Sequence, residues 1–335
     1  MLLTPLHTRM LTLRIVWGEG ARLVAEGRIL DLRKRGVVPM LGKLQGPGVV
    51  HDMSVRIVLE PQTLLIRSVE PVMSAFPFTP AAATRGEGCP DRLPDVQRLV
   101  GASLRDGFGP RLGSEIGGPR GCFHIFTMLR MIGPSIEMVA DRHQRLRRLA
   151  ASQTNSGPLF SRSLIIDGLK GEGLSLALRG ALFDLHYRPG AEVLPIEEEL
   201  EESFEATADL KVEIPAMTIG ECTARVRQSG AQIDKPGEWQ VESTAQQLLG
   251  KSLLKGYTAQ VQAEYAQTSG FEPLQHLLFM MAPAMIQCFP SLAEEMEQRP
   301  RRAEGPHAAV DSCHMWRAGG PLVNAAIWGT ESSKT

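Results

Sequence analysis

The sequence lacks an excess of charge of either sign, and it lacks long apolar runs. Lys+Arg number 36 and Asp+Glu 37 among 335 residues, so bulk charge would not attract nucleic acid or an anionic membrane surface. No stretch reaches the ~18 consecutive apolar residues of a membrane span. Arg9, Arg14 and Glu19 interrupt the region where a signal peptide has its apolar core. We therefore expect a cytoplasmic protein that binds neither nucleic acid nor membrane.

Several motifs of common enzyme classes are also missing. The sequence has no phosphate-cradling glycine loop, no serine nucleophile elbow and no dinucleotide fingerprint. Cysteines are few, odd in number and widely spaced, which argues against a disulfide framework and for thiols, metal ligands or a nucleophile. The five are Cys89, Cys122, Cys222, Cys288 and Cys313.

An internal repeat is present. Four pairs of segments match in the same order, the first two at an offset of 153 residues and the last two at 149. In the third pair six of twelve positions are identical. The pairs are 27–32 with 180–185, 51–66 with 204–219, 97–108 with 246–257, and 121–134 with 270–283. A duplicated domain follows from this pattern.

The repeat predicts an α+β fold built from two tandem copies of a sheet-plus-helices unit related by a pseudo-twofold axis. We expect a first copy at 10–140, a linker at 141–170, a second and degenerate copy at 171–290, and a C-terminal segment, 291–335, that folds back. Within each copy, paired strands precede the helices. A further strand is expected near 110–117, with its counterpart near 257–266.

The repeat also identifies residues that only the first copy has. The second copy carries Phe204 and Glu205 in place of His51 and Asp52, and Pro273 in place of His124. Cys89 and Cys122 likewise have no cysteine counterpart. Residues kept for the fold should match between the copies, so these five indicate one site in the first copy.

Thiolate, imidazole and carboxylate are the usual ligands of zinc and iron, so the candidate metal ligands are Asp52, Cys89, Cys122, His51 and His124. Adjacent strand residues point to opposite faces, so without a bulge only one of His51 and Asp52 can be a ligand. Cys122 lies at the start of a helix expected to open at Gly121, where the helix dipole favours a thiolate.

Two resemblances follow from these motifs. The strings His51-Asp52-Met53, Gly121-Cys122-Phe123-His124 and Cys313-His314-Met315-Trp316 resemble an uncharacterised bacterial family of unknown function. More distantly, Val50-His51-Asp52, Gly88-Cys89 and Gly121-Cys122 resemble the NifU N-terminal, IscU-like iron–sulfur scaffold fold. The second resemblance implies a metal site of Asp52, Cys89 and Cys122. Because Val50 replaces the first cysteine of that family, zinc or mononuclear iron is favoured over a cluster.

The leading hypothesis is a metal-dependent hydrolase or lyase acting on a small organic substrate, with His51, His124 and His314 as candidate catalytic residues. His314 lies outside the repeat and would join the site if the C-terminal segment folds back. A metal or iron–sulfur scaffold protein is the second hypothesis, and a metal-free Cys122–His124 thiol enzyme the third. The sequence leaves homo-oligomerisation open.

Overall fold

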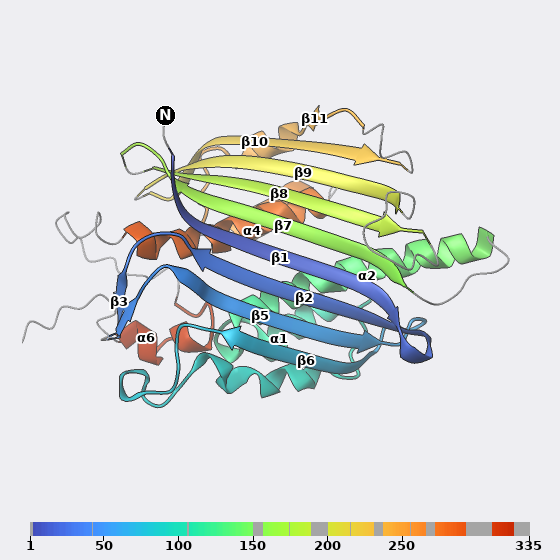
Figure 1. Ribbon diagram of the computed structural model, residues 1–335, viewed down its shortest axis with the longest axis horizontal. Helices are drawn as coiled ribbons and strands as arrows, with labels where there is room; N and C mark the ends of the chain where they lie inside the picture. The colour runs from blue at the N-terminus through green and yellow to red at the C-terminus, as the bar shows by residue number, and fades with distance from the viewer. Residues whose placement is uncertain are drawn as a thin grey trace, which may run out of the picture. The chain divides into compact units, whose positions relative to one another are not determined.

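The structure is a computed structural model in which strands and helices are both abundant (Figure 1). The residues that it describes are 3–41, 43–105, 107–149, 157–173, 175–188, 200–214, 216–230, 237–254, 256–265, 272–292 and 310–324. Of the expected linker, residues 150–156 lie outside this set, as do 293–309 and 325–335 of the expected C-terminal segment.

The chain forms two compact units whose boundaries differ from the expected ones. Unit one comprises Met1–Leu23 and Val139–Phe289, and unit two comprises Val24–Met138 and Pro290–Thr335. The start of the chain belongs to unit one because β1 (Thr4–Gly18) pairs antiparallel with β7 (Pro158–Lys170) along almost its whole length. This pairing satisfies backbone groups that would otherwise form an exposed sheet edge.

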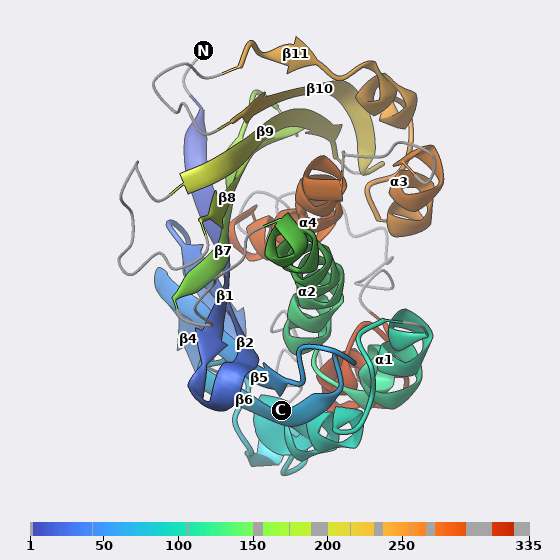
Figure 2. The same cartoon turned by 90° about the vertical axis from the view of Figure 1, so that its right-hand side faces the viewer.

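Unit one is an antiparallel sheet covered on one face by helices. Its strands follow the order β11-β10-β9-β8-β7-β1. α4 (Glu272–Cys288) lies against β7, β8 and β9, and α3 (Tyr257–Tyr265) packs on α4 (Figure 2). The remaining strands are β8 (Ser175–Tyr187), β9 (Leu200–Glu213), β10 (Thr218–Ser229) and β11 (Gln240–Val241). Its short 3₁₀ helices are η1 (Glu19–Ala21), which follows β1, and η7 (Ser243–Leu248). A further one, η8 (Phe289–Leu292), begins at the last residue of unit one and continues in unit two.

Unit two contains the strand order β2-β5-β6 and the start of a long helix (Figure 1). Its strands are β2 (Arg22–Arg33), β5 (Gly48–Leu59) and β6 (Ile66–Ala75), with the small hairpin β3 (Val38–Met40) and β4 (Lys43–Gln45). Its helices are α1 (Phe108–Ile116), the first part of α2 (Phe123–Leu149) and α6 (Pro321–Asn324). The 3₁₀ helices of this unit are η2 (Ala82–Thr84), η3 (Cys89–Arg92), η4 (Pro94–Leu99), η5 (Gly118–Arg120) and η10 (His314–Trp316).

Three sequence-based expectations were wrong in detail. The segments expected as strands near 110–117 and 257–266 are the helices α1 and α3. In α1 the buried residues are Phe108, Leu112 and Ile116, which recur every four residues as on one face of a helix. The expected linker is replaced by the end of α2 and the whole of β7, because the β7 backbone pairs with β1 and β8 on either side.

The same order of main elements occurs twice along the chain when the short elements η1, β3, β4, η2, η3, η5 and β11, each without a described counterpart, are left out. The series β1, β2, β5, β6, η4, α1, α2 is followed by β7, β8, β9, β10, η7, α3, α4. Isolated bridges recur at the sequence offsets, as Leu65–Ser103 and Thr218–Ser252. A side-chain hydrogen bond recurs too: the Gln97 amide donates to the Val69 carbonyl, and the Gln246 amide to the Cys222 carbonyl.

Among the described residues, no helix combines the length and the apolar character that crossing a membrane requires.

We expect Gly168→Ala to lower the free energy of unfolding by about 1–3 kcal/mol, the usual cost of overpacking. A Cβ atom at Gly168 in β7 would overlap Sγ of Cys288, which is fully buried at the end of α4. Denaturant unfolding measures the effect. Gly220→Ala is the matched control, because a Cβ there would come no closer than 3.5 Å to any atom, which is ordinary van der Waals contact. Equal stability of the two variants would contradict this packing.

The free energy of unfolding should also fall as the pH drops from about 6.5 to 4. Burial lowers the pKa of His186 in β8 from 6.5 to about 4, and the positive charge of Arg142 adds to this. The folded state thus disfavours a proton that the unfolded chain accepts, so stability is lost below pH 6.5, up to about 3 kcal/mol. His186→Gln should flatten this slope in denaturant titrations; an unchanged slope would refute the assignment.

Candidate functional site

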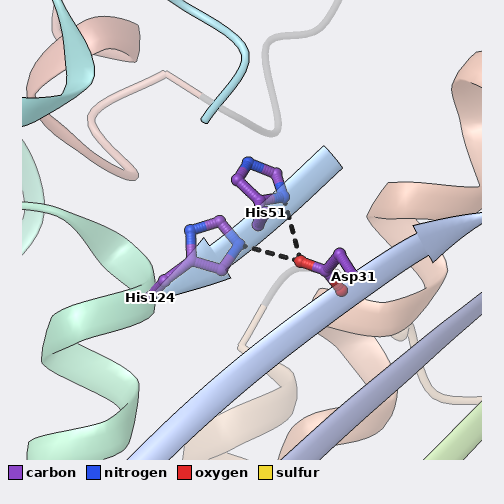
Figure 3. A group of neighbouring side chains, drawn as sticks. All are labelled: Asp31, His51 and His124. Carbon is purple, nitrogen blue, oxygen red and sulfur yellow. Dashed lines mark ion pairs between the residues drawn. The ribbon is translucent and has the colours of Figure 1, made fainter. Parts of the chain in front are cut away.

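Two imidazole side chains converge on one carboxylate oxygen of Asp31 in unit two (Figure 3). Oδ2 of Asp31 lies 3.0 Å from Nδ1 of His51 and 3.3 Å from Nε2 of His124. One ligand atom from each residue lies within 4.8 Å of the other two. We call these residues the Asp31 cluster; among the described residues, it is the one group of three or more His, Cys, Asp or Glu side chains with this spacing.

Strand alternation and a helix start position the three side chains. Asp31 lies on the buried face of β2, in a strand whose residues alternate between buried and exposed towards its end. His51 lies on the buried face of β5, one position before the partly exposed Asp52. His124 is the second residue of α2, so a helix end brings its imidazole to the strands. Elements far apart in the sequence thus meet at this point.

The Asp31 cluster is nearly closed to solvent. The side chains of Asp31, His51 and His124 are 0%, 7% and 11% exposed. The two imidazole rings lie with centroids 4.1 Å apart and planes inclined by 34°. Nδ1 of His51 is buried and makes no hydrogen bond of acceptable geometry with a described residue, although it faces Asp31 at 3.0 Å. Such a nitrogen is suited to donate its lone pair to a cation.

Cys122 lies beside the Asp31 cluster, at the N-terminus of α2. Its carbonyl accepts the backbone hydrogen bond of Phe126 at 2.9 Å, which makes it the residue that begins the helix. Its Sγ lies 4.0 Å from Nδ1 of His124 and 3.8 Å from Sδ of Met53, which shares the buried face of β5 with His51. His124 therefore faces Asp31 with one ring nitrogen and Cys122 with the other.

Cys89 and Cys313 lie in a neighbouring apolar cluster. Both pack against Phe78, Met315 and Leu322. Burial raises the pKa of the Cys89 thiol, and the nearby Cys122 and Cys313 raise it further. Burial likewise raises the pKa of Cys313. The three thiols are thus neighbours, but among the described residues Cys89 and Cys122 are not part of a group with metal-ligand spacing.

Asp52 is not brought to the Asp31 cluster. Arg28, from the exposed face of β2, donates to both carboxylate oxygens of Asp52 at 2.7 Å. This guanidinium holds the pKa of Asp52 below its usual range. No bulge turns Asp52 towards His51, because the irregularity of the β5–β6 pairing there lies between Asp52 and Met53 and leaves the alternation of β5 intact.

His314 is held by charged groups close to the start of α2. Its backbone N–H donates to the Gly121 carbonyl at 2.9 Å, so His314 lies against the residues that precede α2. Nε2 lies 3.0 Å from Glu87, which also forms a double ion pair with Arg317 at 2.6 Å. Burial lowers the pKa of His314, and Arg317 and Arg92 lower it further. Among the described residues, His314 is not part of the Asp31 cluster.

Sequence reasoning missed Asp31, the centre of the cluster. It matches Asp184 of the second copy, so the comparison of the copies assigned it to the fold. In unit one, Asp184 accepts two hydrogen bonds from the buried Arg162, which also contacts His276. A second signal was available: Asp31 falls on the apolar phase of an alternating strand, where a carboxylate needs a specific partner.

Comparison with known proteins finds one similarity, to a family of unknown function, over part of the chain. Residues 7–136 match a family model described as "Protein of unknown function (DUF2889)". The matched region includes Asp31, His51 and His124, and it agrees with the expected resemblance to an uncharacterised family. No curated protein and no solved structure matches the chain. The resemblance to the iron–sulfur scaffold fold therefore stays an expectation.

At pH 8, Cys89 and Cys313 should react with iodoacetamide at least about ten-fold more slowly than the same cysteines in the denatured chain. Their raised pKa values leave little thiolate, the form that reacts. Peptide mass spectrometry after timed alkylation measures each site separately. Alkylation in the folded protein as fast as in urea would show that these thiols are not held in the apolar cluster.

Proposed function

We propose that this protein is a metal-dependent enzyme of the hydrolase or lyase type, with its ion held by Asp31, His51 and His124. The observation that supports this most strongly is the approach of two imidazole nitrogens to one oxygen of a fully buried carboxylate. This donor set replaces the expected one of Asp52 with cysteines, and it keeps the two histidines.

The chemistry of the donors fits zinc or mononuclear iron. Two histidines and one carboxylate are a ligand set that both metals accept in catalytic sites, where positions are left open for water or substrate. The set contains no sulfur, and this argues against an iron–sulfur cluster and hence against the scaffold hypothesis. The buried His51 Nδ1, without a good hydrogen bond to a described residue, is the kind of group that a bound cation satisfies.

The residues around the cluster suggest how the chain would assist the reaction. A zinc or iron ion would polarise a substrate carbonyl or activate a water molecule. Asp31 and the two histidines would hold their orientation, because neighbouring strands and a helix start fix their backbones. The Cys122 thiol, 4.0 Å from His124 Nδ1, would keep that ring turned with Nε2 towards Asp31. A small organic substrate suits a site with this little exposure.

We also infer that the chain arose by duplication and that only the first copy kept a site. The recurrence of the element order, the bridges and the glutamine hydrogen bond supports this ancestry. In the second copy Phe204 and Pro273 stand at the positions of His51 and His124, so the ligands are absent there. Arg162 pairs with the remaining carboxylate of Asp184. The second copy would then have a structural role and no catalytic one.

A metal-free thiol enzyme is the second candidate. The His124 ring lies between the Cys122 thiol, which faces its Nδ1, and Oδ2 of Asp31, which faces its Nε2. This is the arrangement of a thiol nucleophile, a base and an orienting carboxylate. The separation of 4.0 Å between Sγ and Nδ1 is longer than the hydrogen bond through which a base activates a thiol. We therefore rank the thiol enzyme below the metal-dependent enzyme. No disulfide joins the five cysteines, all of which the structure describes; reduced thiols suit the cytoplasmic location that we propose.

Metal content tests the proposal. The wild-type protein, loaded anaerobically with Zn²⁺ or Fe²⁺ and desalted, should retain about one ion per chain by inductively coupled plasma mass spectrometry. Asp31→Asn and His51→Gln should weaken binding by about 100-fold or more, since loss of an outer-shell partner alone costs 10–100-fold. Asp52→Asn is the matched control and should bind like wild type, because Asp52 lies on the opposite face of β5.

Circular dichroism of each variant checks that it folds. Equal metal retention in wild type and both ligand variants would refute the site. No retained metal, together with inactivation by alkylation at Cys122, would favour the thiol enzyme instead.

A further inference from the structure

Arg33, the last residue of β2, is a buried cation with few partners. It follows Asp31 by two positions on the same face of the strand, and it is only 2% exposed. Its Nη1 donates to the Gln45 carbonyl at 3.2 Å, and its buried Nε has no hydrogen-bond partner among the described residues. Within the part of the chain that the structure describes, no carboxylate forms an ion pair with it. One carbonyl is a weak counterpart for a full charge.

Burying an arginine in this way is costly. A charge removed from water without an opposite charge loses several kcal/mol of solvation, and buried charges in proteins are therefore paired or bind ligands. Burial also lowers the pKa of Arg33, although a guanidinium keeps its proton in proteins. The exposed Arg28 on the other face of β2, by contrast, is paired with Asp52. Arg33 therefore offers donors to something other than the described side chains.

A short series of contacts links Arg33 to the Asp31 cluster from the side of the hairpin. Gln45, which accepts from Arg33, donates from its amide to the Pro77 carbonyl at 3.3 Å. The next residue, Phe78, accepts from the Cys89 backbone at 3.0 Å. The Cys89 thiol is close enough to Cys122 to be affected by its charge. The segments that surround Arg33 are thus those that border the start of α2.

We infer that Arg33 anchors a carboxylate group of the substrate, whose reacting end lies at the Asp31 cluster. Alternate residues of a strand are about 6.6 Å apart, so the two groups of the substrate would be separated by a few bonds. A guanidinium carries one positive charge and a planar fork of donors, which match a singly charged carboxylate in both charge and shape. Phosphate would leave an excess negative charge in a buried place. This inference rests on the proposed function for the reacting end only.

Titration calorimetry with succinate tests the inference. The metal-loaded and the metal-free protein are both titrated, in wild type, Arg33→Gln, Arg33→Lys and the matched control Arg28→Gln. Arg33→Gln should weaken succinate binding by about 30-fold or more, as expected for loss of one partner of a buried charge pair. Arg33→Lys should bind with intermediate affinity, because it keeps the charge and loses the fork. Arg28→Gln should bind like wild type.

Metal content is measured in the same samples, so the two proposals can fail separately. If the wild type retains no metal but binds succinate in an Arg33-dependent way, the anion site stands and the metal site falls. If metal is retained and succinate binds wild type and Arg33→Gln equally well, the carboxylate anchor is refuted. Absence of succinate binding to the wild type refutes it as well. Phosphate binding tighter than succinate would overturn the choice of a carboxylate. If Arg33→Gln does not fold by circular dichroism, Arg33→Lys decides, and wild-type affinity in it refutes the anchor.

Discussion

The alternation of side chains along β2 and β5 is the constraint on which the candidate site depends. In β2, Asp31 and Arg33 share the buried face, while Arg28 faces outward. In β5, His51 shares its face with Met53, and Asp52 points the other way. A shift of one residue in either strand would exchange these sets, so the register that buries the apolar residues also selects the polar residues that meet.

The two units treat a buried aspartate differently. In unit one, Asp184 is bound by Arg162, whose guanidinium also contacts His276, and all three side chains are buried. This arrangement satisfies the carboxylate with groups from the protein itself. In unit two, two imidazoles lie against Asp31, and a buried guanidinium lies two residues further along the strand without a described carboxylate partner. Polar groups concentrated in this way cost stability, and proteins retain them where they serve function.

The described C-terminal residues connect parts of unit two that are distant in sequence. The Gly121 carbonyl accepts from His314, and Glu87 binds Arg317, so the segment holds the loop before η3 and the start of α2. Cys313 and Trp316 pack against the apolar cluster of Phe78, Met315 and Leu322. The apolar contacts and the ion pairs thus both tie the described C-terminal residues to segments near Cys122.

The sequence by itself predicted a fold of strands and helices, and it identified His51 and His124 through the contrast between the two matched sets of segments. These follow from local patterns: alternation, segment matches and the contrast between copies. It could not reveal that 110–117 and 257–266 are helical, because each helix has only nine residues, and glycines or polar residues within them blur the helical period of 3.6. The comparison of the matched segments also led us to leave Asp31 out of the candidate site, because an aspartate stands at the matching position, Asp184. The two aspartates nevertheless have different partners: Asp184 binds Arg162, and Asp31 faces two imidazoles. Only the tertiary structure decided that Asp52 faces Arg28 and that Asp31 faces His51 and His124, because the partner of a buried charge is set by which strands and helix ends meet in space.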